Sequence, residues 1–472
     1  MTEAAKTAAF VVAAGILALL AWGTSPSRTD PGVFEGQGER FFPDFTDPLV
    51  ATSLEVIEFE ELQGIPRPFK VHWKDGRWTI PSHHDYPADA KDRLKKTAAA
   101  VIDLLKDSVR SDRKEDHEAL GVLDPLDEKA SLKGRGKRVT LRDRNGRVLA
   151  DLILGKASGR EGVRYARVPG QGRVYATRIS EEVSAKFSDW IETDLLQLDA
   201  WQVSRVRIDS YSIDETQGTL KDRQQFALAK GDGDAWTMEG LAQDEDLASD
   251  RVSEMTSALD DLKIVGVRLK PVGLTENLTR QQGIEITREA ALSLQRKGYY
   301  LTQDGGIYSG EGELNVEMKD GVVYTLRFGE VLVGEGEELE TGTGEDKPPE
   351  PGKPPVEKKG TEGRYLMVTA KFDPTLVPEP KPEEPKPDAT EEDKKKLQEE
   401  YERKKKPWEG EVQKGKDRAK ALSERFAKWY YVIPADAYRK IRLTRADLAR
   451  KKVEPPKPGG EVEPPKEGDP PK

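Results

Sequence analysis

One order of secondary-structure signals occurs twice in this chain, and it constrains the fold more than any other feature of the sequence. Each occurrence begins with an alternating apolar and polar stretch, which is typical of a strand, and continues with a hairpin and an amphipathic helix. Two paired strands, a further strand region and a closing helix follow. In the first occurrence these elements fall at 52–59, 69–80, 88–109, 138–142 with 148–154, 163–176, and 180–190.

The second occurrence repeats this order with longer connections. Its elements fall at 203–213, 226–238, 247–262, 314–318 with 322–328, 364–372, and 419–429. Trp78 and Trp236 occupy matching hairpins, and Phe187 with Trp190 matches Phe426 with Trp429 in the closing helices. We therefore predict an α+β protein with two tandem similar units, each an antiparallel sheet of hairpins packed by helices.

The two predicted units span 47–199 and 200–448, and each has its own expected core. In the first unit the core residues are Trp78, Leu94, Val101, Leu105, Leu141, Leu152 and Trp190. In the second unit they are Trp236, Val252, Leu259, Leu326, Phe426 and Trp429.

Two insertions lengthen the second unit, at 334–363 and 377–416. Both are rich in Glu, Gly, Pro or Lys and lack an apolar pattern, so we expect mobile excursions whose excision changes the melting temperature little. Within the second, 391–406 pairs opposite charges four residues apart, which indicates an exposed helix. The tail at 449–472 is Pro-rich, and we expect it to be disordered.

The N-terminal region holds the longest apolar stretch of the chain, at 7–23. It reaches the lower length limit for a membrane-spanning helix, with a stub at 1–6 before it and a linker at 24–46 after it. An uncleaved anchor is the favoured reading. A cleaved signal peptide with Ala21-Trp22-Gly23 at the cut, or a core helix of a cytosolic protein, is the alternative. Lys6 favours an orientation with the bulk of the chain outside the cytoplasm, on the periplasmic side of the inner membrane.

Composition excludes several classes of function. The formal net charge is −10, which argues against a nucleic-acid partner because phosphates require a basic surface. The chain has no cysteine, so disulfides, thiol catalysis, cysteine metal ligands and a lipidated N-terminal cysteine are excluded.

No motif predicts catalysis, and we assign no catalytic, cofactor-binding or metal-binding residue. His83-His84-Asp85 offers metal-ligand types, but adjacent residues rarely chelate one ion from the same side, so a solvated turn is expected. Lys230–Asp234 resembles half of a calcium loop, yet it lacks the downstream Glu and lies between two strands, which favours a hairpin turn. The basic run Lys133–Arg138 enters a strand and not a helix, so we expect an exposed connector.

Several short motifs resemble the bacterial family called domain of unknown function 4340. They are Leu120-Gly121 with Pro125, Leu152–Lys156, Arg164–Arg167 and Gly172–Tyr175. The resemblance covers most of the first unit and, more weakly, the second. It implies an envelope protein with an N-terminal anchor, encoded near export ABC-transporter components of the gliding-motility type, and it supplies no catalytic residues.

These features lead to one functional expectation and one alternative. We expect a membrane-anchored, exported, non-enzymatic accessory or scaffold protein of an ABC-transporter-linked envelope assembly. It would contact the membrane through its N-terminal helix and would need no cofactor. The alternative is a hydrolase acting on an envelope polymer through an unrecognised pair of carboxylates.

Overall fold

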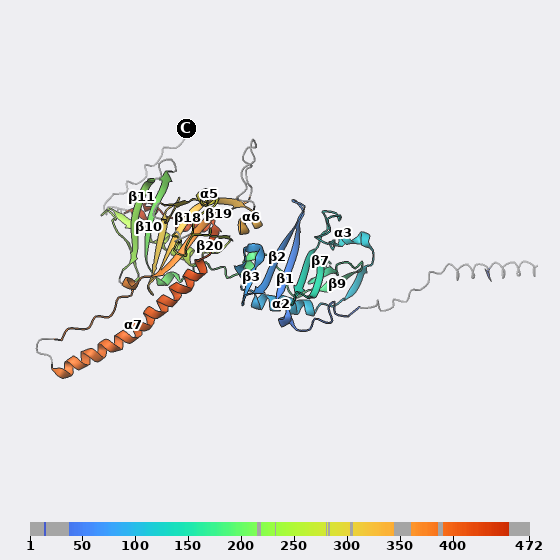
Figure 1. The fold of residues 1–472 in the computed structure, drawn as a ribbon, viewed down its shortest axis with the longest axis horizontal. Helices are drawn as coiled ribbons and strands as arrows, with labels where there is room; N and C mark the ends of the chain where they lie inside the picture. The colour runs from blue at the N-terminus through green and yellow to red at the C-terminus, as the bar shows by residue number, and fades with distance from the viewer. Residues whose placement is uncertain are drawn as a thin grey trace, which may run out of the picture. The chain divides into compact units, whose positions relative to one another are not determined.

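The computed structural model describes residues 37–214, 219–231, 233–279, 281, 284–302, 305–343, 360–385 and 390–452, together with Ala14 and Gly15. It divides into two compact units (Figure 1). The first consists of Met1–Ile80 and Ala88–Asp189, and the second of Pro81–Pro87 and Trp190–Lys472. Each unit contains a large antiparallel sheet and helices, so the predicted α+β class is confirmed.

The sheet of the first unit is built from hairpins. From β3 onward its strand order is β3-β2-β1-β6-β7-β8-β9-β5, and each neighbouring pair is antiparallel. The strands are β1 (Ser53–Glu60), β2 (Ile65–Lys74), β3 (Arg77–Ile80), β5 (Ser108–Ser111), β6 (Lys137–Arg142), β7 (Val148–Ala157), β8 (Val163–Arg167) and β9 (Val174–Arg178). The helices are η1 (Pro48–Val50), α2 (Lys91–Ile102), η3 (Lys114–Asp116), α3 (His117–Leu120) and η4 (Phe187–Trp190).

The sheet of the second unit has the order β12-β11-β10-β17-β18-β19-β20-β14, again antiparallel throughout. Its strands are β10 (Val203–Asp214), β11 (Thr219–Lys230), β12 (Trp236–Met238), β14 (Gly266–Leu269), β17 (Glu313–Met318), β18 (Val322–Gly334), β19 (Thr361–Phe372) and β20 (Trp429–Pro434). Two small sheets pair β13 (Glu245–Leu247) with β21 (Ala449–Lys451) and β15 (Tyr299–Leu301) with β16 (Ile307–Ser309).

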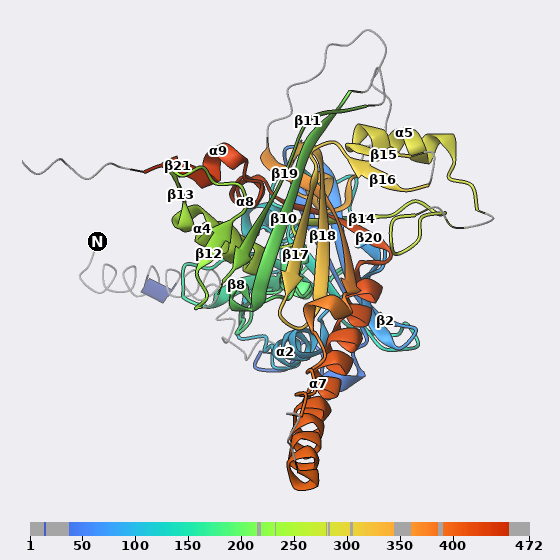
Figure 2. The same cartoon turned by 90° about the vertical axis from the view of Figure 1, so that its left-hand side faces the viewer.

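Helices and short helical turns complete the second unit. They are η2 (Pro81–His83), η5 (Ala200–Gln202), α4 (Ser249–Asp260), α5 (Arg288–Arg296), α6 (Glu337–Thr341), η6 (Pro374–Leu376), α7 (Glu391–Phe426), α8 (Ala435–Ile441) and α9 (Arg445–Leu448). The two-residue strand β4 (Tyr86–Pro87) lies in the segment Pro81–Pro87. Figure 2 shows α5, β15 and β16 together beside the second sheet, and α7 extending well beyond it.

The two sheets place corresponding strands at corresponding positions. In both, the first three strands of the unit form one side of the sheet, and the strand after the first long helix lies at the opposite edge. The pairing register agrees as well. Across β7 and β8, Leu154 pairs with Ala166, and after an irregularity Ala157 pairs with Arg164. Across β18 and β19, the same interruption separates two pairs, Phe328 with Leu366 and Val331 with Arg364.

Each unit also begins with a lead-in segment that precedes its first strand. Arg40 forms an antiparallel bridge with Leu105 in the first unit, and Asp194 forms one with Lys263 in the second. The described part of the predicted linker at 24–46 therefore pairs within the first unit. For the same reason the second unit starts at Trp190 and not at residue 200, because its residues 190–199 bond within it.

Most of the predicted core residues are buried. In the first unit α2 buries Leu94 and Val101, and the strands bury Leu141 and Leu152. Leu105 is 39% exposed, because the helix expected at 88–109 ends at Ile102. Strand β5 occupies the end of that range.

In the second unit most of the predicted core residues are buried as well. Three tryptophans of the two predicted cores differ from the expectation. Val252, Leu259, Leu326, Phe426 and Trp429 are buried, and so is Trp190, which packs in this unit. The hairpin residues Trp78 and Trp236 are only partly buried, each in its own unit, because each lies on a short strand near a sheet edge.

The expected closing helices are not counterparts. The helix predicted at 180–190 is reduced to the four-residue turn η4 after β9. The helix predicted at 419–429 is the end of α7 and precedes β20, which pairs in the sheet as β9 does. The match of Phe187 and Trp190 with Phe426 and Trp429 was therefore wrong. Both pairs are buried, but they approach their sheets from different connections.

The first predicted insertion, 334–363, is partly an ordered piece of the second unit. Gly334 ends β18, Thr361 begins β19, and α6 lies just after the first of these strands with Leu339 and Thr341 buried. The expectation of a mobile excursion is wrong for these residues. Leu339 packs in the core of the second unit, although the segment around it is acidic. Residues 344–359 lie outside the described part of the chain.

The described residues of the second predicted insertion, 377–416, are buried only at its ends, at Val377 and Gly415, and the helix expected at 391–406 is exposed as predicted. Its helix was expected at 391–406, but α7 continues to Phe426 without a break and buries Gly415, Ala419 and Leu422 along one side. The segment before it lies along the same helix. The Trp408 indole donates to the Val377 carbonyl oxygen at 2.9 Å, and the Tyr401 hydroxyl donates to Glu379 at 2.9 Å.

The predicted anchor at 7–23 lies outside the described residues apart from Ala14 and Gly15, as do the stub at 1–6 and residues 453–472 of the tail. In the part of the chain that the structure describes, no helix is long and apolar enough to cross a membrane. Residues 449–451 of the predicted tail form β21.

Candidate functional site

A groove of about 830 Å³ lies in the second unit, between α5 and the end of β14. Its apolar lining comes from Leu269, Leu292, Leu294 and Tyr430, and the charged residues of the lining are Glu289, Arg296 and Lys297. Leu269 and Leu292 are 47% and 49% exposed, whereas Leu294 and Tyr430 are buried in the core beneath. The groove thus joins an exposed apolar rim to a well-packed floor.

Helix α5 is positioned by local chemistry at both ends. The Thr287 side chain accepts a hydrogen bond from the Ala290 amide and caps the first turn. Gly298 follows the helix with φ of +80° and lets the chain turn directly into β15. Buried Leu294 fixes the helix on the sheet, so Leu292 is presented to solvent at the groove.

Strand β14 is the edge of the second sheet, and only its beginning is covered. A β-carbon at Gly266 would collide with the carbonyl oxygen of Leu339, so α6 lies directly against this end of the strand. Arg268 holds α6 in place, since its guanidinium donates hydrogen bonds to the carbonyl oxygens of Glu338, Leu339 and Glu340 at 3.0 to 3.2 Å. The other end, Leu269, opens onto the groove.

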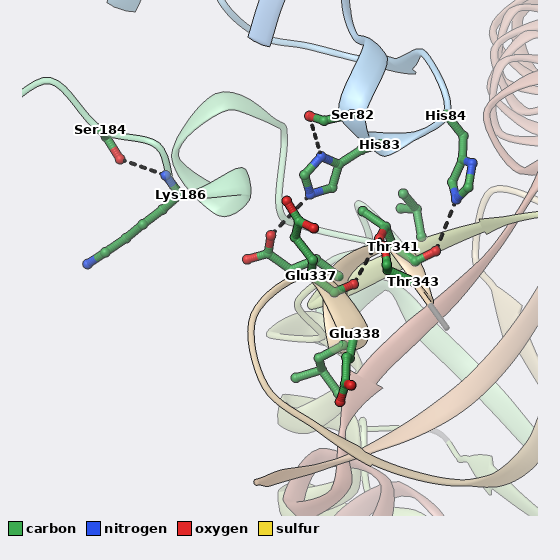
Figure 3. Close-up of polar contacts among 12 residues, drawn as sticks. Ser82, His83, His84, Ser184, Lys186, Glu337, Glu338, Thr341 and Thr343 are labelled. Carbon is green, nitrogen blue, oxygen red and sulfur yellow. Dashed lines mark hydrogen bonds and ion pairs between the residues drawn. The ribbon is translucent and has the colours of Figure 1, made fainter. Parts of the chain in front are cut away.

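The segment Pro81–Pro87 binds the other side of α6, and Figure 3 shows the polar contacts. His83, which is buried, places Nε2 3.1 Å from Glu340 Oε2 and Nδ1 3.0 Å from Ser82 Oγ. His84 Nε2 lies 3.0 Å from the Thr341 carbonyl oxygen. The expectation of a solvated turn for His83-His84-Asp85 is therefore wrong for His83, which is buried, whereas His84 is exposed although it contacts the end of α6.

Lys270 directly follows β14 and is a buried cation next to the groove. The Lys270 ammonium donates to the Phe426 carbonyl oxygen at 2.8 Å. Burial and the positive charge of Arg327 lower the pKa of Lys270, Glu276 partly opposes them, and the net value is about 7. Lys270 lies between Leu269 and Pro271, which both line the groove, but it is not itself part of the lining.

The two other polar motifs of the sequence, Lys230–Asp234 and Lys133–Arg138, make contacts within their own units. At Lys230–Asp234 the chain turns between β11 and β12, with Asp232 outside the described residues. The Lys230 ammonium lies 5.4 Å from the Trp236 ring centroid, and Asp234 pairs with Lys319 at 3.2 Å.

The basic run Lys133–Arg138 is not a free connector either. Arg135 donates hydrogen bonds to the carbonyl oxygens of Asp124, Pro125, Ala130 and Ser131 and stacks 4.2 Å from the Phe59 ring centroid. Arg138 bonds both oxygens of Asp151, at 3.0 and 2.7 Å. These contacts occupy the guanidinium groups of Arg135 and Arg138.

Across the described ranges, no group of three or more His, Asp or Glu side chains is arranged to hold a metal ion. The groove residues were not predicted from the sequence. Thr287 followed by helix formers, with Gly298 after them, was the local signal for α5. Nothing in the sequence indicates that α5 lies beside β14, because no local pattern relates these two elements.

Two antiparallel sheets with matching strand orders define a two-unit α+β protein with a groove beside one sheet edge. Residues 78–277 match the model of the family described as Domain of unknown function (DUF4340). The matched region begins within β3 of the first unit and ends beyond β14 of the second. No curated protein and no solved structure matches this chain.

Proposed function

We propose that the protein is a membrane-anchored, exported, non-enzymatic scaffold that binds another envelope protein through the groove beside β14. The observation that carries the proposal is the open end of this edge strand, where exposed Leu269 and Leu292 rim an apolar groove. An edge strand offers unpaired backbone groups, and a neighbouring apolar groove offers side-chain specificity.

The partner would add an extended segment along β14 and place an apolar side chain in the groove. Arg268 and α6 block the beginning of the strand.

Pairing would therefore start at the Leu269 end of the strand. Export ABC-transporter components of the envelope are the partner class that the family resemblance supports.

We further infer that the two units are tandem copies of one α+β unit. The shared strand order, the shared interruption between β7 and β8 and between β18 and β19, and the paired lead-in bridges support this inference. An experimentally determined structure in which the eight corresponding strands do not superpose would contradict it.

The hydrolase alternative finds no support in this groove. Among the described residues that line it, Glu289 is the only carboxylate, and a glycosidase needs a pair flanking the bond. We therefore develop only the scaffold proposal.

The binding proposal is tested by co-purification from detergent-solubilised membranes. The wild-type chain should retain transporter components, and the double variant Leu269→Asp with Leu292→Asp should lose them, because charges would enter the apolar rim. Val331→Asp is the matched control, since Val331 is 46% exposed on β18 of the same unit and away from the lining. Equal retention by the double variant would overturn the groove as the binding site.

The anchor and the orientation need a separate test. A reporter that is active only after export, fused after Leu448, should be active, and mass spectrometry of the mature N-terminus should find residues 7–23 retained. An inactive reporter would refute export, and a cut after Gly23 would refute the anchor in favour of a signal peptide.

A further inference from the structure

A second cavity, of about 280 Å³, lies wholly within the first unit. It is formed by the turn η1, the hairpin of β2 and β3, the first turns of α2 and the β6–β7 turn. The residues that give it its chemistry are Leu49, Trp73, Trp78, Lys91, Lys95 and Arg144. This volume suits a single ring with one substituent.

The apolar wall of this cavity is aromatic and accessible. Trp73 and Trp78 pair directly across β2 and β3, and their ring centroids are 5.4 Å apart at an interplanar angle of 71°. Trp73 is 39% exposed and Leu49 is 68% exposed. Two perpendicular indoles beside an exposed leucine form a corner against which a flat apolar face can pack.

The rest of the rim is cationic. Lys91, Lys95 and Arg144 line the cavity, and none of them makes an ion pair or a side-chain hydrogen bond with another described residue. No carboxylate of the described residues is in the lining. The three cations lie together although the chain carries more acidic than basic side chains, 86 against 76. Their common complement is an anion.

The second unit provides an internal comparison at the corresponding hairpin. Lys230 pairs with Trp236 across β11 and β12, at the place where Trp73 pairs with Trp78. Its ammonium lies over the Trp236 ring and donates to the Trp201 carbonyl oxygen at 3.2 Å. There the unit's own lysine occupies the aromatic face, whereas in the first unit the corner between the two indoles is open.

We propose that this cavity binds a small organic anion that carries a carboxylate on a ring with an apolar face. The ring packs against Trp73 and Trp78, and the carboxylate is held by Lys91, Lys95 and Arg144. The site is independent of the proposed groove beside β14. The same chemistry could be presented by a free ring acid or by a uronate unit of an acidic polymer.

Isothermal titration of the full chain tests the proposal, with benzoate, glucuronate and a glucuronate oligosaccharide as probes and with acetate and neutral benzamide as controls. Benzoate or glucuronate should bind at least about tenfold more tightly than acetate, which has no ring, and benzamide should bind weakly because it has no charge. Binding of the oligosaccharide alone among the sugars would identify a polymer source, and binding of benzoate alone a free aromatic acid. Both results support the site.

Three variants locate the binding. Lys95→Gln and Arg144→Gln should each weaken binding about tenfold, since each removes a charge-assisted contact. Trp73→Ala should abolish the preference for ring anions, and Trp201→Ala is the matched control because Trp201 is 63% exposed in the other unit. Trp73→Phe keeps an aromatic face if the alanine variant fails to fold. Equal binding of acetate and benzoate, no binding of any probe, or binding unchanged in the Gln variants would overturn the proposal.

Discussion

His83 Nε2 lies 3.1 Å from Glu340 Oε2, although the two residues are 257 positions apart in the chain. The contact fastens Pro81–Pro87 to α6 within the second unit. Replacement of His83 by Ala should remove a buried hydrogen bond and destabilise α6 locally by about 1 to 3 kcal/mol. Hydrogen exchange by mass spectrometry should therefore show faster exchange in a peptide covering Glu337–Thr341.

His117→Ala is the matched control for this prediction. His117 is also buried, and its Nε2 lies 2.7 Å from the Gly172 carbonyl oxygen in the first unit. Its loss should accelerate exchange near Gly172 and leave α6 unchanged. Unchanged exchange at α6 in His83→Ala would show that the histidine does not hold the segment.

Lys270 predicts an unusual dependence of stability on pH. Burial and the charge of Arg327 lower its pKa from 10.5 to about 7 in the folded chain. Between these two values the unfolded chain binds more protons than the folded chain, so the free energy of unfolding should rise with pH, by on the order of 2 kcal/mol from pH 7 to pH 9. Thermal melts across this range should show the rise, and Lys270→Met should remove it. A slope unaltered by the substitution would assign the dependence to other groups.

Gly329 predicts a position where no side chain is tolerated. A β-carbon there would collide with the Lys297 carbonyl oxygen and lie 2.9 Å from the Tyr299 ring. Gly329→Ala should therefore destabilise the second unit by about 1 to 3 kcal/mol. Gly410→Ala is the control, because Gly410 lies inside α7 with nothing within 4 Å of its β-carbon position. It should stabilise the helix by about 0.5 to 1 kcal/mol. Urea denaturation followed by fluorescence compares the two, and a neutral Gly329→Ala would contradict the packing.

The two insertions should respond differently to excision. Joining Thr343 to Gly360 through a short Gly/Ser linker should change the melting temperature little, because loop closure entropy varies slowly with length. Removing 377–416 should lower it clearly, since Trp408 and Gly415 would be lost. A β-carbon at Gly415 would lie 2.7 Å from the Phe372 ring, so α7 packs tightly on β19. Differential scanning calorimetry measures both deletions, and an unchanged melting temperature after the second would show that this packing is not stabilising.

Local patterns predicted the strands well. The turns at Lys74-Asp75-Gly76 and Lys319-Asp320-Gly321 fixed two hairpins, and the alternation around Leu141, Leu152 and Leu326 placed these residues in the cores. Period and turn chemistry are properties of neighbouring residues, so they can be read without the fold.

Contacts between distant segments could not be read in this way. Leu339 is one apolar residue in an acidic stretch, and only its packing beneath Arg268 makes α6 part of the unit. The groove beside β14 likewise depends on where α5 lands on the sheet. Trp408 was visible in the charged helix, but its partner is a backbone carbonyl that no sequence pattern marks.

The division of the chain has a consequence for how its parts can be separated. The polypeptide passes between the units after Ile80, after Pro87 and after Asp189. A protease that cuts once after Asp189 would leave Pro81–Pro87 attached to the first fragment and still docked in the second unit by His83 and His84. Neither unit is therefore a continuous stretch of sequence. A gene divided at that boundary would encode a second unit without Pro81–Pro87 and a first unit with this segment still attached.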